Sequence, residues 1–175
     1  VQRSRDKSDI EDEALRLLDR VGLREFRDKY PSQLSGGMQR RAELARAMIN
    51  EPRLMLLDEP FRGLDAMTRE LMQEYFLRLY EEKRQTVLFV TSEIDEAIFL
   101  ADKLVLMSNK PGHIIESFDI DLPRPRDPHV LTSQEYLRYK EEALEILHDE
   151  ALKAFAGGSK AAADFVEAYD RREHD

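Results

Sequence analysis

Residues Leu34–Asp65, LSGGMQRRAELARAMINEPRLMLLDEPFRGLD, contain a polar turn and an apolar run that ends in two acids, joined by one amphipathic helical pattern. The first segment, Leu34–Gly37, is a turn whose serine hydroxyl can accept a hydrogen bond from a first-turn N–H and so cap the helix. Its two glycines have no side chains, which lets a ligand approach the backbone amides. Those amides and the helix dipole suit a phosphate group. Ser35, Gly36 and Gly37 are therefore candidate phosphate-binding residues.

The second segment is Leu54–Glu59, LMLLDE, in which four apolar residues precede two acids. This pattern predicts a fully buried parallel strand with Asp58 and Glu59 at its C-terminal tip. Ligands of open α/β sheets collect at that edge. The carboxylate of Asp58 suits Mg²⁺, a hard cation that prefers oxygen ligands and retains several waters.

The rest of the chain predicts a layered α/β fold with one partly parallel sheet, which contains the strands at 54–58, 86–91 and 103–108. Helices are expected at residues 8–20, 23–30, 36–50, 66–83, 93–101, 133–156 and 159–172, and strands at 54–58, 86–91, 103–108 and 113–121, the last two as a hairpin. Ser8 is expected to cap the first helix. Leu71, Tyr75 and Leu79 are expected to form the core stripe of the helix at 66–83, with Met67 and Met72 as further candidates. Prolines make residues 122–128 an extended connector.

Together with the later segments Gly63-Leu64-Asp65 and Thr91-Ser92, this pattern resembles the ATP-binding cassette (ABC) ATPases, the motor subunits of ABC transporters. The matching segments are the signature motif at Leu34–Gly37, the Walker B strand at Leu54–Asp58, the catalytic glutamate position at Glu59 and the D-loop at Gly63–Asp65. The resemblance implies a P-loop NTPase-like fold. It also implies a helical subdomain at 1–50, an ATPase core at 51–128 and a C-terminal helical extension at 129–175.

The resemblance also implies ATP and Mg²⁺ as cofactors, with the metal at Asp58. In the family, Glu59 would polarise the water that attacks the γ-phosphate. Nucleotide contacts would come from the signature turn, from Asp65 and from Ser92. A plain helix N-cap is the alternative role for Asp65, and the two roles are compatible.

Two departures from the family pattern affect the chain's own ATP site. The sequence contains no Gly-Lys dipeptide and therefore no phosphate-binding loop of the form Gly-x-x-x-x-Gly-Lys-Ser/Thr. Ser92 stands where the family has its switch histidine, and a hydroxyl does not replace an imidazole. The chain therefore looks like the C-terminal part of a nucleotide-binding domain. Whether it hydrolyses ATP at its own site stays open.

The resemblance implies a head-to-tail dimer with a second ABC ATPase subunit, a membrane permease as partner and a place at the cytoplasmic face of the membrane. The LPRPRD connector and residues 96–102 look most like the nitrate/sulfonate/taurine importers. One alternative is a degenerate, non-catalytic cassette that lends its signature motif in trans. Another is a soluble ATPase of the same superfamily acting on nucleic acid or ribosomes, which the net charge of −9 disfavours. The absence of cysteine fits a reducing compartment.

Overall fold

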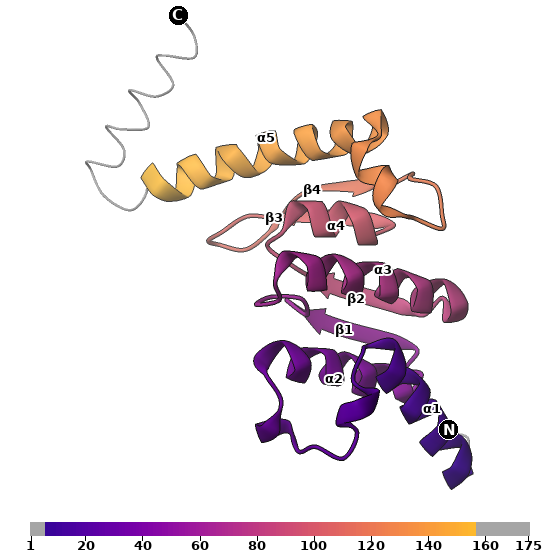
Figure 1. Cartoon of the computed structure of the whole chain (residues 1–175). Coiled ribbons are helices and arrows are strands. Elements are labelled where there is room, and N and C mark those ends of the chain that lie inside the picture. Colours follow the sequence, from indigo (N-terminus) through magenta and orange to yellow (C-terminus); the bar gives the residue numbers. More distant parts are fainter. Residues whose placement is uncertain (1–5, 157–175) are drawn as a thin grey trace, which may run out of the picture. The chain divides into compact units, whose positions relative to one another are not determined.

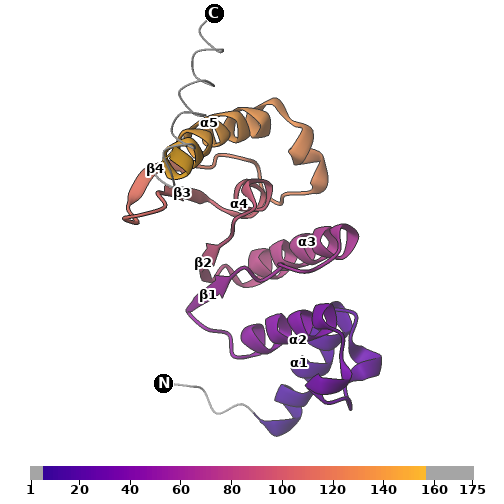
Figure 2. The ribbon, with the colours of Figure 1, turned by 90° about the vertical axis from the view of Figure 1, so that its left-hand side faces the viewer.

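The computed structural model describes residues 6–156, which form two compact units (Figures 1 and 2). Unit 1 contains the residues up to Ser92 together with Arg124–Asp127, and unit 2 contains Glu93–Pro123 and the residues from Pro128 onward. The helix predicted at 159–172 lies outside the described residues. The functional division at residues 50 and 128 stays a prediction.

The helices of unit 1 are α1 (Lys7–Arg20), α2 (Gly36–Ile49) and α3 (Ala66–Lys83), with short 3₁₀ helices at Arg24–Phe26 and Pro31–Gln33. The predicted cap at Ser8 is wrong, because α1 begins one residue earlier and its N-cap residue, Asp6, makes no side-chain cap bond. The helix expected at 23–30 is reduced to one 3₁₀ turn. Pro31 begins the next turn rather than ending a helix, since its fixed φ suits a first helical position.

The parallel strands β1 (Leu54–Asp58) and β2 (Thr86–Val90) form the sheet of unit 1, and their arrowheads point the same way in Figure 1. The predicted strands are confirmed, but the prediction that β1 is buried on both faces is wrong. Met55 and Leu57 are buried against the helices, whereas Leu54 is 54% and Leu56 is 68% exposed. The strand side chains alternate between faces, and only one face of this sheet is covered by the residues that the structure describes.

The covered face of the sheet packs on α3 through a stripe that differs from the predicted one. Leu79 and the further candidate Met72 are buried as expected, and Phe76 joins them in the core. Leu71 and Met67 are 62% and 66% exposed, so their predicted place in the stripe is wrong. Positions 72, 76 and 79 follow the i, i+4, i+7 spacing of one helix face. Phe61 is also in this core, and its ring lies near the rings of Phe76 and Phe89, which are close to each other too.

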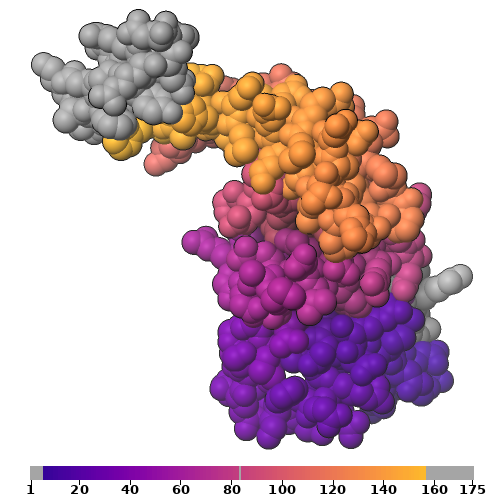
Figure 3. All heavy atoms as spheres, turned by 45° about the horizontal axis from the view of Figure 1, so that its top comes forward, coloured from indigo at the N-terminus to yellow at the C-terminus, as the bar shows by residue number. Residues whose placement is uncertain are grey.

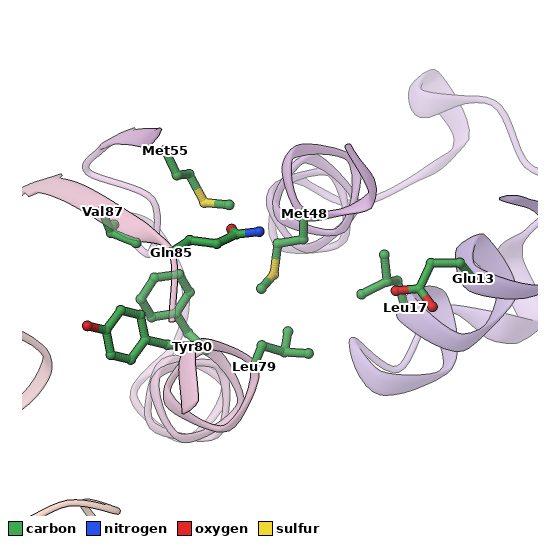
Figure 4. Close-up of a pocket in the computed structure, with 9 residues that line it drawn as sticks. Glu13, Leu17, Met48, Met55, Leu79, Tyr80, Gln85 and Val87 are labelled. Atoms are coloured by element: carbon green, nitrogen blue, oxygen red, sulfur yellow. The ribbon is translucent and has the colours of Figure 1, made fainter. Parts of the chain in front are cut away.

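A small pocket lies within unit 1 between the helices and the covered sheet face (Figure 4). Its walls are mostly apolar and come from all three helices and both strands: Glu13, Leu17, Met48, Met55, Phe76, Leu79, Tyr80, Gln85 and Val87. None of the predicted site residues lines it. The pocket is therefore part of the hydrophobic core, where flexible methionines fill an irregular space.

Unit 2 consists of α4 (Ile94–Leu100), the strands β3 (Lys103–Met107) and β4 (Ile114–Asp119), a 3₁₀ helix at Pro128–Thr132 and the long helix α5 (Gln134–Ala156). The predicted hairpin is confirmed, since β3 and β4 pair in antiparallel orientation. The expectation that 103–108 belongs to the same sheet as β1 and β2 is wrong. In the described residues β3 pairs with β4 alone. The connector before Pro128 has no helix or strand, as its prolines predict.

Polar contacts fix α5 to α4 within unit 2. The Tyr136 hydroxyl donates to Asp95 Oδ1 at 2.5 Å, and Lys140 Nζ lies 2.7 Å from the same oxygen. Partial burial raises the pKa of Asp95, but hydrogen bonds from Lys140 and Tyr136 outweigh it and lower the pKa overall. Burial, together with the bond to this carboxylate, raises the pKa of Tyr136. The C-terminal helix is thus anchored to the fold by a charge as well as by apolar packing.

The apolar packing of α5 completes the core of unit 2. The buried residues of this core are Ile98, Leu104, Leu106, Ile120, Leu122, Tyr136, Tyr139 and Ala143. The Tyr139 hydroxyl accepts a hydrogen bond from the Asp121 N–H at 3.1 Å, which ties α5 to the end of the hairpin. Figure 3 shows the atoms of α5 in orange and yellow. No helix within residues 6–156 has a stretch long and apolar enough to cross a membrane.

Candidate functional site

The turn that the sequence predicts as a phosphate site lies at the start of α2 in unit 1. Ser35 is the N-cap residue, and its hydroxyl oxygen accepts a hydrogen bond from the Met38 N–H at 3.3 Å. The cap predicted from the sequence is confirmed. Gln39 supports the turn from inside the helix, because its side-chain amide donates to the carbonyls of Pro31 and Leu34 at 2.8 and 3.1 Å. The turn that presents Ser35 is therefore held at both ends.

The two glycines of the turn have different surroundings. A Cβ atom added at Gly36 would meet nothing within 4 Å, so the approach to this residue is open. A Cβ atom at Gly37 would lie 3.3 Å from the side chain of Leu64, so this glycine allows close packing against the D-loop segment. The open position at Gly36 fits the predicted approach of a phosphate to the helix N-terminus.

Glu59 is fixed by hydrogen bonds to its N–H and to its carboxylate. Its backbone N–H donates to the Val90 carbonyl at 2.9 Å, and its carboxylate Oε1 accepts from the Ser92 N–H at 2.9 Å. Its φ of +46° lies in the left-handed region, which is uncommon for a residue with a side chain. Such a conformation persists only where the surrounding structure holds it, and it is frequent at functional sites.

The C-terminal ends of β1 and β2 bring the acidic and hydroxyl groups to one sheet edge. Asp58 is the register partner of Val90, so the predicted placement of Asp58 and Ser92 at the same edge is confirmed. Both residues are exposed to solvent, whereas Glu59 is half-buried between them. This edge therefore presents one exposed and one anchored carboxylate beside a serine.

Asp65 is the N-cap residue of α3, and its Oδ1 accepts a hydrogen bond from the Thr68 N–H at 3.0 Å. Hydrogen bonds from the Thr68 side chain and N–H lower the pKa of Asp65. The predicted capping role of Asp65 is thus confirmed. A nucleotide or dimer role for Asp65 stays a prediction.

Arg40 and Arg41 make long-range contacts that could not be predicted from the sequence. Basic residues on a helix pattern indicate a solvated face, yet both side chains donate to backbone carbonyls. Arg40 Nη2 lies 3.2 Å from the backbone carbonyl oxygen of Glu59, and Arg41 Nη1 lies 2.8 Å from the backbone carbonyl oxygen of Val21. No local sequence pattern could have predicted these partners, because they lie about 20 residues away in the chain.

The described residues fit part of a Mg-ATP site. Asp58 offers one exposed carboxylate at the sheet edge, and within residues 6–156 no group of three or more His, Asp or Glu side chains could hold a metal by itself. The exposed Asp58 carboxylate suits Mg²⁺, which typically takes one or two carboxylates and completes its shell with water and phosphate oxygens. The turn at Ser35 and Gly36 suits a phosphate.

A parallel sheet edge with carboxylates, beside a capped helix N-terminus, is an arrangement typical of nucleotide-binding α/β proteins. The sequence profile of the ABC transporter family matches residues 2–62. The chain belongs to the ABC ATPases, as its motifs indicated.

Similar proteins support this assignment. The chain is 47% identical over 133 residues to the nitrate import ATP-binding protein NrtD of Synechococcus elongatus, covering 75% of this chain and 48% of that protein. It is 40% identical over 136 residues to the aliphatic sulfonates import ATP-binding protein SsuB of Bacillus cereus, covering 78% and 53%. The predicted resemblance to nitrate and sulfonate importers is confirmed. The chain spans about half the length of the curated relatives it matches.

The fold is similar to that of solved ABC cassettes. A dimeric structure of a bacterial ABC transporter cassette matches with a TM-score of 0.59 and 30% sequence identity, over 69% of this chain and 51% of that one. The predicted P-loop NTPase-like fold is therefore confirmed.

Proposed function

We propose that this chain acts in the ATP-binding subunit of an ABC importer and couples ATP binding to solute transport through a membrane permease. The observation that carries the proposal is the anchored Glu59, whose carboxylate accepts the Ser92 N–H at the edge where Asp58 ends β1. The named activities of its relatives, import of nitrate and of aliphatic sulfonates, favour a small oxyanion as solute. Such a subunit would work at the cytoplasmic face of the membrane.

Each site residue has a chemical role in this proposal. The Asp58 carboxylate would help to hold Mg²⁺, which would neutralise phosphate charge. Glu59 would orient the attacking water, a positioning role that its hydrogen bond to Ser92 prepares. Ser92 would meet the γ-phosphate with a hydroxyl in place of an imidazole, which weakens this part of the site.

The signature turn would act on a second ATP. In a head-to-tail dimer, the hydroxyl of Ser35 and the first amides of α2 would face the γ-phosphate of a nucleotide held by a partner's phosphate-binding loop. Gly36 leaves room for that approach. The helix dipole would stabilise the phosphate charge.

A sequence observation favours a version in which the chain's own site is silent and only its signature turn acts, whereas a structural observation favours a version in which another segment completes that site. The sequence has neither a phosphate-binding loop nor a switch histidine. The outer face of the β1–β2 sheet is also open, with Leu56 68% and Leu88 58% exposed. Parallel sheets are usually covered on both faces. We infer that a segment carrying a phosphate-binding loop packs on this face and completes the ATPase core.

Assembly with partners tests the proposal. Purified with a permease and an ABC subunit that carries an intact phosphate-binding loop, the chain is expected to co-purify and to stimulate ATP turnover, whereas the chain alone turns over none. The matched control is the same assembly lacking this chain. Co-purification with ribosomes or nucleic acid instead of the permease would refute the importer role.

A further inference from the structure

The guanidinium of Arg40 joins α2, the helix that begins at the signature turn, to Glu59. Arg40 lies on α2, five residues after the cap residue Ser35, and its Nη2 donates to the Glu59 carbonyl at 3.2 Å. Its Nη1 pairs with the Glu43 carboxylate at 3.1 Å, which holds the guanidinium from its other side. The bond to Glu59 is partly buried, so it is less screened by water than a surface ion pair.

The carbonyl that Arg40 contacts belongs to the residue with the least common backbone conformation of the site. Glu59 has a φ of +46°, and its carbonyl also accepts the Arg62 N–H at 3.2 Å. Rotation about the N–Cα bond of Glu59, which sets φ, would move this carbonyl and the side chain that reaches the Ser92 N–H together. A bond that holds the carbonyl can therefore affect the direction of the Glu59 carboxylate without touching it.

A second contact joins the same two segments. The Gly37 position packs so closely on Leu64 that an added Cβ would lie 3.3 Å from its side chain. The first turns of α2 therefore contact residues 59–64 at two points, one polar and one apolar. Two contacts fix the direction of a helix end better than one.

We propose that Arg40 is a positioning residue that couples the signature turn at Ser35 to the Glu59 end of the sheet. A change in the conformation of the turn would then change the position of the Glu59 carboxylate, and the reverse. The importance of this coupling for ATP turnover rests on the proposed function. The coupling itself is a property of the 175-residue chain and can be measured without nucleotide.

Nuclear magnetic resonance on the chain tests the coupling by a double-mutant cycle, which isolates the interaction between two positions. The probe is the amide signal of Ser92, whose N–H binds the Glu59 carboxylate. Ser35→Ala removes the cap of α2 and is expected to shift this signal. In an Arg40→Met background the shift caused by Ser35→Ala should be mostly lost, while Arg40→Lys, which keeps one donor, should retain part of it.

Glu43→Gln is the matched control, because it removes the ion pair of Arg40 but leaves the donor to Glu59; the coupling should survive it. Signals of the buried Phe61 region report whether each variant is folded. An unchanged effect of Ser35→Ala in both Arg40 variants would overturn the inference. Loss of coupling in Glu43→Gln equal to that in Arg40→Met would also overturn it. Neither result depends on ATP turnover, so the proposed function would be judged separately.

Discussion

Replacing Ser35 with glutamate is expected to nearly abolish ATP turnover in a complex that contains this chain and a loop-bearing partner. The change removes the hydroxyl that would meet the γ-phosphate and adds a negative charge at the open side of the turn. A hydrogen bond to a charged group is worth about 1.5–3 kcal/mol. Lost from the transition state, it corresponds to about a 10- to 150-fold lower rate, and charge repulsion adds to this.

Glu59→Gln is the comparison that separates the two versions of the proposal. If the partner's site is the only active one, this change leaves turnover nearly intact, because Glu59 belongs to the silent site. Steady-state ATPase rates are compared for complexes with the unchanged chain, with Ser35→Glu and with Glu59→Gln, and they show which ATP site is active. Equal, mild losses from both changes would rule out the trans role of Ser35. A collapse from Glu59→Gln alone would show that this chain's own site works despite Ser92.

Phe61→Ala is expected to destabilise unit 1 by about 3–5 kcal/mol, the usual cost of emptying a buried phenylalanine site. Phe61 is 2% exposed, and its ring centroid lies 5.7 Å from that of Phe89 and 6.3 Å from that of Phe76. It follows Glu59 by two residues, so loss of this anchor should also loosen the carboxylate. Denaturant unfolding followed by circular dichroism, with amide exchange in β1 and β2, measures the effect.

The matched control for this change is Phe26→Ala. Phe26 lies in the same unit but is 41% exposed, so its truncation should cost far less. Equal losses from the two variants would contradict the assignment of Phe61 to the core. Protection of the β2 amides should fall only in the Phe61 variant.

The sequence predicted the strands and the capped turn because those signals are local. Apolar runs bounded by turn residues located β1 and β2, and a serine before a helical pattern located the cap at Ser35. The shared edge of Asp58 and Ser92 followed from parallel pairing. Each of these predictions needed only residues close together in the chain, together with a general rule for parallel sheets.

The errors arose where tertiary context decides. An apolar run reads as buried on both faces, yet the burial of Leu56 depends on what covers the sheet, and no described residue covers that face. The stripe of α3 was predicted only in part, because apolar residues occur on more than one side of that helix: Met72 and Leu79 are buried, but Leu71 is exposed. The N-cap residue of α1 is Asp6 and not Ser8. Both residue types are common helix caps, and the two positions are only two residues apart in the sequence.

The long-range contacts of the site could not be predicted at all. The link from Arg40 to the Glu59 carbonyl joins residues 19 positions apart, and a solvated face was the natural interpretation of the arginine. The bond from the Ser92 N–H to the Glu59 carboxylate spans 33 positions. The positive φ of Glu59 is equally absent from the sequence, because residues other than glycine rarely adopt it.

Calorimetric titration with Mg-ATP tests the central claim most directly, namely that the chain contributes its signature turn to a nucleotide held by another segment's phosphate-binding loop. The chain alone should show no binding in the micromolar range, because it lacks the lysine-bearing loop that makes most phosphate contacts. With a loop-bearing partner whose own signature serine has been replaced, binding should appear, and it should weaken when this chain carries Ser35→Glu. Micromolar affinity of the chain alone would contradict the claim.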